Sequence, residues 1–196
     1  MFHLSMRIVR EEHEALETVL RSFASLVKRG PRHGQRNFFD ELRAMLFYIH
    51  EFPERLHHSK ESNLLFPRVL RMAPEIMEVV VRLENEHESC SHRVLKLQHL
   101  LLAWEFVGDV RRHAFEVEAS DFVSFYLEHM RLEETVVLPA AMRVLNEADW
   151  EELDAAFAKN CDPLTGRDKR DPVFNKLFKR IMAALADAER APEEVA

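Results

Sequence analysis

Four long stretches of this chain carry apolar residues at steps of three and four, and only four glycines among 196 residues are available to interrupt them. That spacing is typical of amphipathic α-helices, in which positions three and four apart lie on one face. The stretches cover residues 4–28, 37–65, 74–106 and about 120–145. Because short links join them, the sequence predicts an all-α fold, an up-down-up-down four-helix bundle.

Prolines and glycines set the expected limits of these helices. Gly30 ends the first stretch and Gly108 ends the third. Pro53 lies inside the second stretch, where it removes a backbone hydrogen bond and is expected to kink the helix. Pro67 is expected to end that helix, because the residue before a proline disfavours helical backbone angles.

Beyond residue 147 the sequence pattern changes. A short helix is expected to begin at residues 149–153, and the apolar spacing of residues 173–185 predicts a final amphipathic helix. We therefore divide the chain into a four-helix bundle over residues 1–147 and a C-terminal helical extension over residues 148–196. The extension is expected to pack on the bundle or to form a homodimer.

Charge and composition argue against several classes of function. The 27 Lys and Arg against 34 Asp and Glu give a formal net charge of −7, whereas a nucleic-acid binder carries a basic face. No apolar run approaches the roughly 18–20 residues that cross a bilayer, and the N-terminal residues become charged too early for a secretory signal. We expect a cytoplasmic protein with no nucleic-acid or membrane partner. No nucleophile triad, phosphate loop or dinucleotide motif is visible, so any enzymatic activity should be metal-based redox chemistry.

The histidines, eleven in all, form an internal repeat. Each half of the chain has a Glu-His-Glu tripeptide and then a His-x3-Glu pair whose histidine precedes a proline by ten residues: 12–14, 57–61 and Pro67, then 86–88, 129–133 and Pro139. The two histidines are 44 residues apart in the first half and 42 in the second. Such a repeat predicts that the two halves carry matching parts of one site.

The spacing of this repeat indicates a metal centre. A histidine and a glutamate four residues apart lie one turn apart on one helix face, and four helices that turn these faces inward bring their side chains together in the core. Buried carboxylates are costly unless cations neutralise them. Nitrogen and oxygen ligands that leave coordination positions open favour iron, here a di-iron centre. The predicted metal ligands are His13, His57, Glu61, His87, His129 and Glu133.

The residues leave two choices open within this set. His58 precedes Glu61 by three residues and so shares its face, which makes it an alternative to His57, although only His57 keeps the register of the repeat. Glu134 is an alternative to Glu133 in the same way. The other histidines are assigned no ligand role: His3, His33, His50, His92, His99 and His113.

The segments FPERLHHSKESNLLFP and LEHMRLEETVVLP resemble the hemerythrin-like, or HHE cation-binding, family, and the resemblance covers roughly residues 5–145. It implies a four-helix bundle with a non-haem di-iron centre and carries the family ligands onto the same six residues. Members of the family bind oxygen, sense oxygen, iron or nitric oxide, or help to repair iron centres. The resemblance implies a protein that meets oxygen, peroxide or nitric oxide in a sensing or stress-response role. The alternative is iron storage, delivery or iron-centre repair through a partner protein.

Two positions differ from the oxygen-carrying members of that family. Those proteins have a histidine four residues before the one that matches His87, and this chain has Leu83 there. They also place the last carboxylate five residues after its histidine, which would select Glu134. Both differences argue against reversible oxygen carriage.

Overall fold

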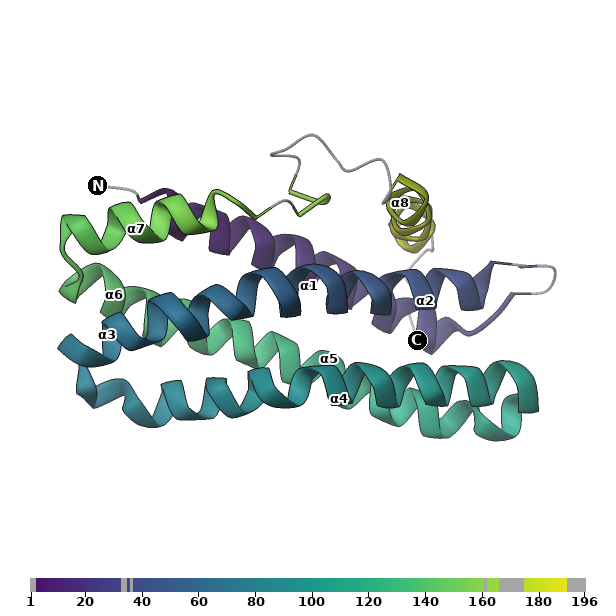
Figure 1. The fold of residues 1–196 in the computed structure, drawn as a ribbon. Coiled ribbons are helices and arrows are strands. Elements are labelled where there is room, and N and C mark those ends of the chain that lie inside the picture. Colours follow the sequence, from purple (N-terminus) through teal and green to yellow (C-terminus); the bar gives the residue numbers. More distant parts are fainter. Residues whose placement is uncertain (1–2, 33–34, 36, 161, 166–174, 190–196) are drawn as a thin grey trace.

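The computed structural model describes residues 3–32, 35, 37–160, 162–165 and 175–189, and four antiparallel helical rods form its body (Figure 1). The first rod is α1 (Leu4–Arg29), and the third is α4 (Met77–Val107). The second rod contains α2 (Phe38–Ile49) and α3 (Phe66–Met72), and the fourth contains α5 (Arg112–Leu132) and α6 (Leu138–Val144). The predicted all-α bundle is confirmed.

π-helical segments interrupt the second and fourth rods at matching places. His50–His58 and Glu61–Leu65 lie between α2 and α3, and Glu133–Val137 lies between α5 and α6. Pro67 and Pro139 follow as the second residues of α3 and α6, directly after a π-helical segment in each rod. The prediction that Pro67 ends the helix was therefore wrong, since the helix continues to Met72.

The fourth rod begins earlier than the sequence predicted. α5 starts at Arg112, directly after Gly108 and a single 3₁₀ turn, and not near residue 120. Phe115 and Ala119 extend the buried stripe of Phe122 towards the N-terminus of the helix, and each of the three is at most 2% exposed. Because apolar residues at this spacing continue back to the glycine, the acidic Asp121 is not a helix start.

Gly108 allows the chain to reverse between the third and fourth rods. Its φ is +97°, and nothing lies within 4 Å of the place that a Cβ would occupy. We expect Gly108→Ala to lower the free energy of unfolding by about 1–2 kcal/mol through backbone strain alone. Urea denaturation measures this change. The control, Val110→Ala at an 81% exposed position, should stay within about 0.5 kcal/mol of the wild type. Equal stability of the two variants would contradict the strain.

Two apolar clusters fill the bundle, and a polar layer separates them. Phe23, Leu42 and Trp104 belong to the cluster near the α1–α2 connection, and Phe66 and Trp150 belong to the cluster at the other end. Each rod contributes to both clusters, and its predicted ligands lie between the two contributions. On α1 they lie between Val9 and Leu16, and on α4 they lie between Leu83 and Cys90. The repeat therefore places its histidines and glutamates at one level of the bundle.

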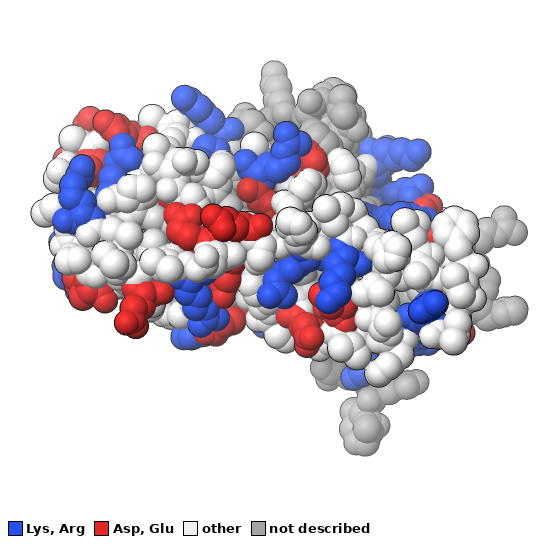
Figure 2. Space-filling view, turned by 60° about the horizontal axis from the view of Figure 1, so that its bottom comes forward, with Lys and Arg blue, Asp and Glu red and all other residues white. Residues whose placement is uncertain are grey.

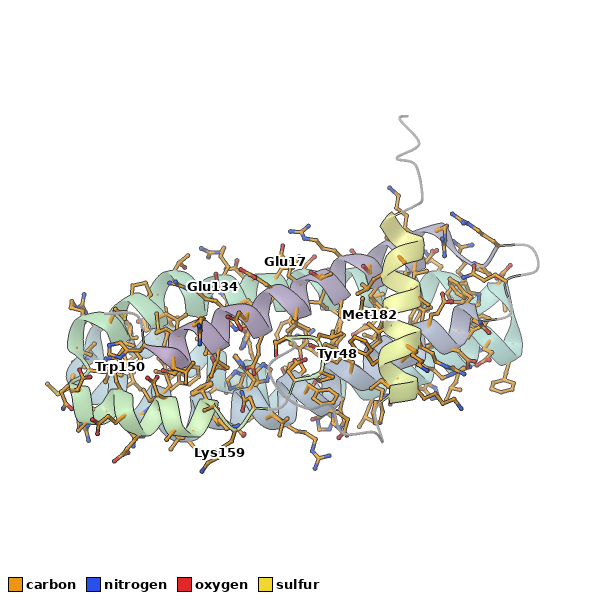
Figure 3. The ribbon with its side chains drawn as sticks, turned by 90° about the horizontal axis from the view of Figure 1, so that it is seen from above. Glu17, Tyr48, Glu134, Trp150, Lys159 and Met182 are labelled. Carbon is orange, nitrogen blue, oxygen red and sulfur yellow. The ribbon has the colours of Figure 1, made fainter. Side chains whose placement is uncertain are left out.

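The C-terminal extension contacts the bundle at two places. α7 (Glu147–Phe157) packs along α1, and α8 (Asn175–Glu189) contacts α1 and α2. Figure 3 shows that α8 crosses the rods instead of running along them. Asn146 caps α7 in a reciprocal capping box with Asp149. The homodimer through this extension, and the domain division at residue 147, stay predictions.

The surface of the molecule mixes charges of both signs. On the face that Figure 2 presents, lysines and arginines alternate with aspartates and glutamates and form no continuous basic stripe. Among the residues that the structure describes, no helix has the length and apolar character needed to cross a bilayer.

Candidate metal centre

All six predicted ligands meet in the polar layer between the two apolar clusters. α1 carries His13, α4 carries His87, α5 carries His129, and the π-helical segments carry the rest. Five of the six are at most 5% exposed, and the side chain of His87 is 7% exposed. The helical repeat thus brings its six ligands to one buried point, and His58, 5% exposed, lies with them.

The first group of candidate ligands contains His13, His57, Glu61 and Glu133, and the nitrogen and oxygen atoms that could bind a metal all lie within 4.8 Å of one another. The Nε2 atoms of His13 and His57 are 3.3 Å apart. Glu61 Oε1 lies 3.1 Å from Nε2 of His57, and Glu133 Oε2 lies 3.3 Å from Nε2 of His13. Two imidazoles and two carboxylates therefore face a common centre.

The second group contains His58, His87 and His129, again within 4.8 Å of one another. The Nε2 atoms of His87 and His129 are 3.1 Å apart. The second oxygens of the same two glutamates approach this group, because Glu61 Oε2 and Glu133 Oε1 each lie 3.7 Å from Nε2 of His87. Glu61 and Glu133 thus stand between the groups, with one oxygen towards each.

Five buried polar atoms at this centre lack a well-formed hydrogen bond. All four carboxylate oxygens of Glu61 and Glu133 are buried, and none receives a hydrogen bond of acceptable geometry from the described residues. Nδ1 of His58 is buried without a partner as well. Buried carboxylates without donors are rare in folded proteins because desolvation costs several kcal/mol. Two cations between the groups would satisfy all four oxygens, so the residues fit a dinuclear centre.

The hemerythrin HHE cation-binding domain model matches residues 5–141, which include all seven of these side chains. The chain belongs to the hemerythrin HHE cation-binding family. No curated protein matches it. Family membership and the histidine–glutamate cluster together show a metal-cation-binding domain. The match ends before α7 and α8, so the C-terminal extension lies outside the family model.

In this hemerythrin domain, glutamates next to the candidate ligands accept hydrogen bonds from the outer nitrogens of the histidines, which are the Nδ1 atoms that face away from the centre. Nδ1 of His57 donates to Glu12 over 2.7 Å, and Nδ1 of His129 donates to Glu86 over 2.8 Å. These glutamates are the first residues of the two Glu-His-Glu tripeptides. A carboxylate on Nδ1 fixes the ring orientation and leaves Nε2 free to bind metal. The sequence signal for this role is the tripeptide itself, whose first glutamate stands at the same place in both halves.

The remaining outer contacts follow the same repeat. Nδ1 of His13 lies 2.8 Å from Glu134 Oε1, and Nδ1 of His87 lies 2.8 Å from Ser62 Oγ. Glu134 and Ser62 each follow a central glutamate in the sequence. Glu134 therefore contacts an outer nitrogen, and Glu133 is the glutamate that faces the other ligands.

His58 is where the two halves differ. The repeat aligns His58 with Met130, so the first group has two histidines and the second has three. The ring of His58 stacks on that of His87 at a centroid distance of 4.1 Å. The sequence treated His58 and His57 as alternatives, but the structure brings both into the centre.

Burial and the facing charges shift the pKa values of these histidines in opposite directions. Burial lowers the pKa of His129, but the facing carboxylates, Glu133 first, outweigh it and raise the value to about 10. Burial likewise lowers the pKa of His57, and Glu61 and Glu12 more than offset it. Burial and the neighbouring imidazoles hold the pKa of His58 well below its usual range. In the metal-free domain, imidazolium protons thus balance the carboxylates, and bound cations would displace them.

A small cavity opens beside the first group. Its apolar wall contains Leu16, Phe52, Pro53, Leu56 and Met130. Its polar wall contains Glu12 and, from the C-terminal extension, Asn160 and Asp162. His13 and His57 of the first group and His58 and His129 of the second group line the same cavity, so a small molecule in it would lie beside both groups.

Proposed function

We propose that this hemerythrin domain holds a di-iron centre in the cytoplasm and binds oxygen, peroxide or nitric oxide there in a sensing or stress-response role. The observation that carries the proposal is the set of four buried carboxylate oxygens that receive no well-formed hydrogen bond and are flanked by five histidines. Imidazole and carboxylate together suit iron better than they suit magnesium or calcium, which prefer oxygen ligands alone.

The side chains divide the work of holding the two ions. His13 and His57 would hold one ion, and His58, His87 and His129 would hold the other, while Glu61 and Glu133, which turn one oxygen towards each group, would help to hold both. Iron supplies redox chemistry and open coordination positions for a small ligand. The carboxylates on the outer nitrogens orient the rings, and the apolar clusters on both sides exclude water.

The unequal histidine counts support a ligand site on the first ion. Met130 occupies the place at the first group that His58 occupies at the second, so the first ion lacks one protein ligand. The cavity borders this group as well as the second one, and Met130 is part of its apolar wall. An apolar wall favours a small uncharged molecule over a hydrated anion.

Anaerobic reconstitution with Fe²⁺ tests this function. We expect about two iron ions per chain and a change in visible absorption when oxygen or nitric oxide is added. His57→Leu should reduce the iron content to about one ion per chain, because it leaves the first group with a single histidine, whereas His99→Leu, at an exposed histidine outside the repeat, should leave it unchanged. Less than one iron per chain in the wild type would refute the di-iron centre.

A further inference from the structure

The two glutamates that hold Nδ1 atoms differ in how they are held themselves. Glu86 accepts from His129 and also from Nε of Arg82, 2.8 Å away and four residues earlier on α4. The position four residues before Glu12 is Ile8, which is 2% exposed and has no side-chain donor. The first half of the repeat therefore lacks the internal donor that the second half has.

Asn160 from the C-terminal extension takes the place of that donor. Its Nδ2 donates to Glu12 Oε2 over 2.9 Å, and the same oxygen accepts from Nδ1 of His57. Asn160 is 4% exposed, and its Oδ1 accepts from the Lys60 ammonium. An ammonium can only donate, so Lys60 fixes the amide with Oδ1 towards itself and Nδ2 towards Glu12.

The extension is attached firmly enough to hold this amide in place. Asp154 of α7 accepts from the backbone N–H groups of Leu4 and Ser5 at the start of α1, over 3.1 and 2.7 Å. Trp150 stacks on His3 at a centroid distance of 4.1 Å. Figure 3 labels Trp150 on α7 and Lys159 just beyond the end of that helix. Asn160 follows Lys159 and is fixed by these contacts to α1.

We infer that Asn160 is a positioning residue for the metal centre: its bond to Glu12 holds the His57 ring with Nε2 towards the first group. The extension, although outside the family model, is thus a working part of the first metal position. Without the amide, Glu12 loses a buried donor, and the orientation of His57 is less restrained. The expected effect on metal release rests on the proposed function. The hydrogen bond from Asn160 to Glu12, however, orients His57 in the metal-free protein as well.

Asn160→Leu tests this role because leucine has nearly the shape of asparagine without its donor. In the full chain loaded with Co²⁺, we expect one of the two ions to pass to a chelator about 10-fold faster than in the wild type, and the other at the wild-type rate. Arg82→Met is the matched variant, because it removes the corresponding donor from Glu86 and should affect the other ion. Lys60→Met keeps Asn160 but frees its amide, so a smaller acceleration in the same direction is expected.

A second measurement separates this inference from the proposed function. In the metal-free protein, ¹⁵N NMR should show the Nδ1 proton of His57 exchanging with solvent several-fold faster in Asn160→Leu and Lys60→Met than in the wild type. Unchanged exchange and unchanged release in both variants, at an unchanged melting temperature, would overturn the role of Asn160. A wild type that binds no metal but shows the faster exchange in its variants would refute the proposed function and leave the role of Asn160 supported.

Discussion

Glu61→Gln is expected to abolish metal stabilisation and yet leave the metal-free protein at least as stable as the metal-free wild type. Glu61 is completely buried, and neither of its oxygens receives a well-formed hydrogen bond. The facing imidazolium protons of the metal-free protein offset only part of the cost of burying this carboxylate. A neutral amide is cheaper to bury, so the substitution removes a cost that the cations would repay in full. Two ions that bind only the native state, each at about 1,000 times its Kd, would stabilise the wild type by about 8 kcal/mol, or roughly 15–30 °C in melting temperature.

Thermal unfolding followed by circular dichroism, with metal and with chelator, measures both halves of this prediction. Glu17→Gln is the control, because Glu17 lies on the outer side of α1 and its side chain is 43% exposed (Figure 3). This variant should keep the full metal-dependent shift. Equal melting temperatures of the wild type with metal and with chelator would refute the metal centre. The metal-free Glu61→Gln protein could instead be far less stable than the metal-free wild type. That result would mean that side chains of the protein stabilise the Glu61 carboxylate without any metal.

Two local regularities made the bundle and the ligand set predictable. The spacing of apolar residues predicted the rods, and the doubled His-x3-Glu pattern predicted side chains that meet in the core. The outer carboxylates were predictable in principle, since Glu12 and Glu86 stand at the same place in the two tripeptides. Both regularities can be seen in sequence because residues close along a helix are also close in space.

The joint role of His57 and His58 could not be predicted in this way. Neighbouring residues of an α-helix point about 100° apart, so a regular helix turns only one of them to the core, and the sequence posed a choice. The π-helical segment His50–His58 changes that register, and both side chains are buried. Asn160 had no local signal at all, because it lies 148 residues from Glu12 and outside the repeat.

A second large effect is expected at Asp162, whose carboxyl group lines the cavity beside the first group. Burial is the main cause that raises its pKa from 3.8 to about 6, and hydrogen bonds from Leu164 N and Tyr48 Oη only partly offset it. A folded pKa above the unfolded one means that ionisation opposes folding. The protonated Asp162 therefore makes its full contribution to the free energy of unfolding below about pH 4. That contribution, up to about 3 kcal/mol, is lost as the pH rises through about 6.

Asp162→Asn should remove this loss, because the amide does not ionise and the Tyr48 hydroxyl can turn to accept from it. Urea denaturation between pH 4 and pH 8 should show a variant close to the wild type at pH 4 and more stable by up to about 3 kcal/mol at pH 8. Asp121→Asn, at an exposed position, should differ from the wild type equally at both pH values. A pH-independent difference for Asp162→Asn would mean that this carboxyl ionises as it does in the unfolded chain. The predicted result instead means that Asp162 is neutral below about pH 6 and adds a negative charge to the polar wall of the cavity above it, so the charge next to a bound small molecule changes with pH.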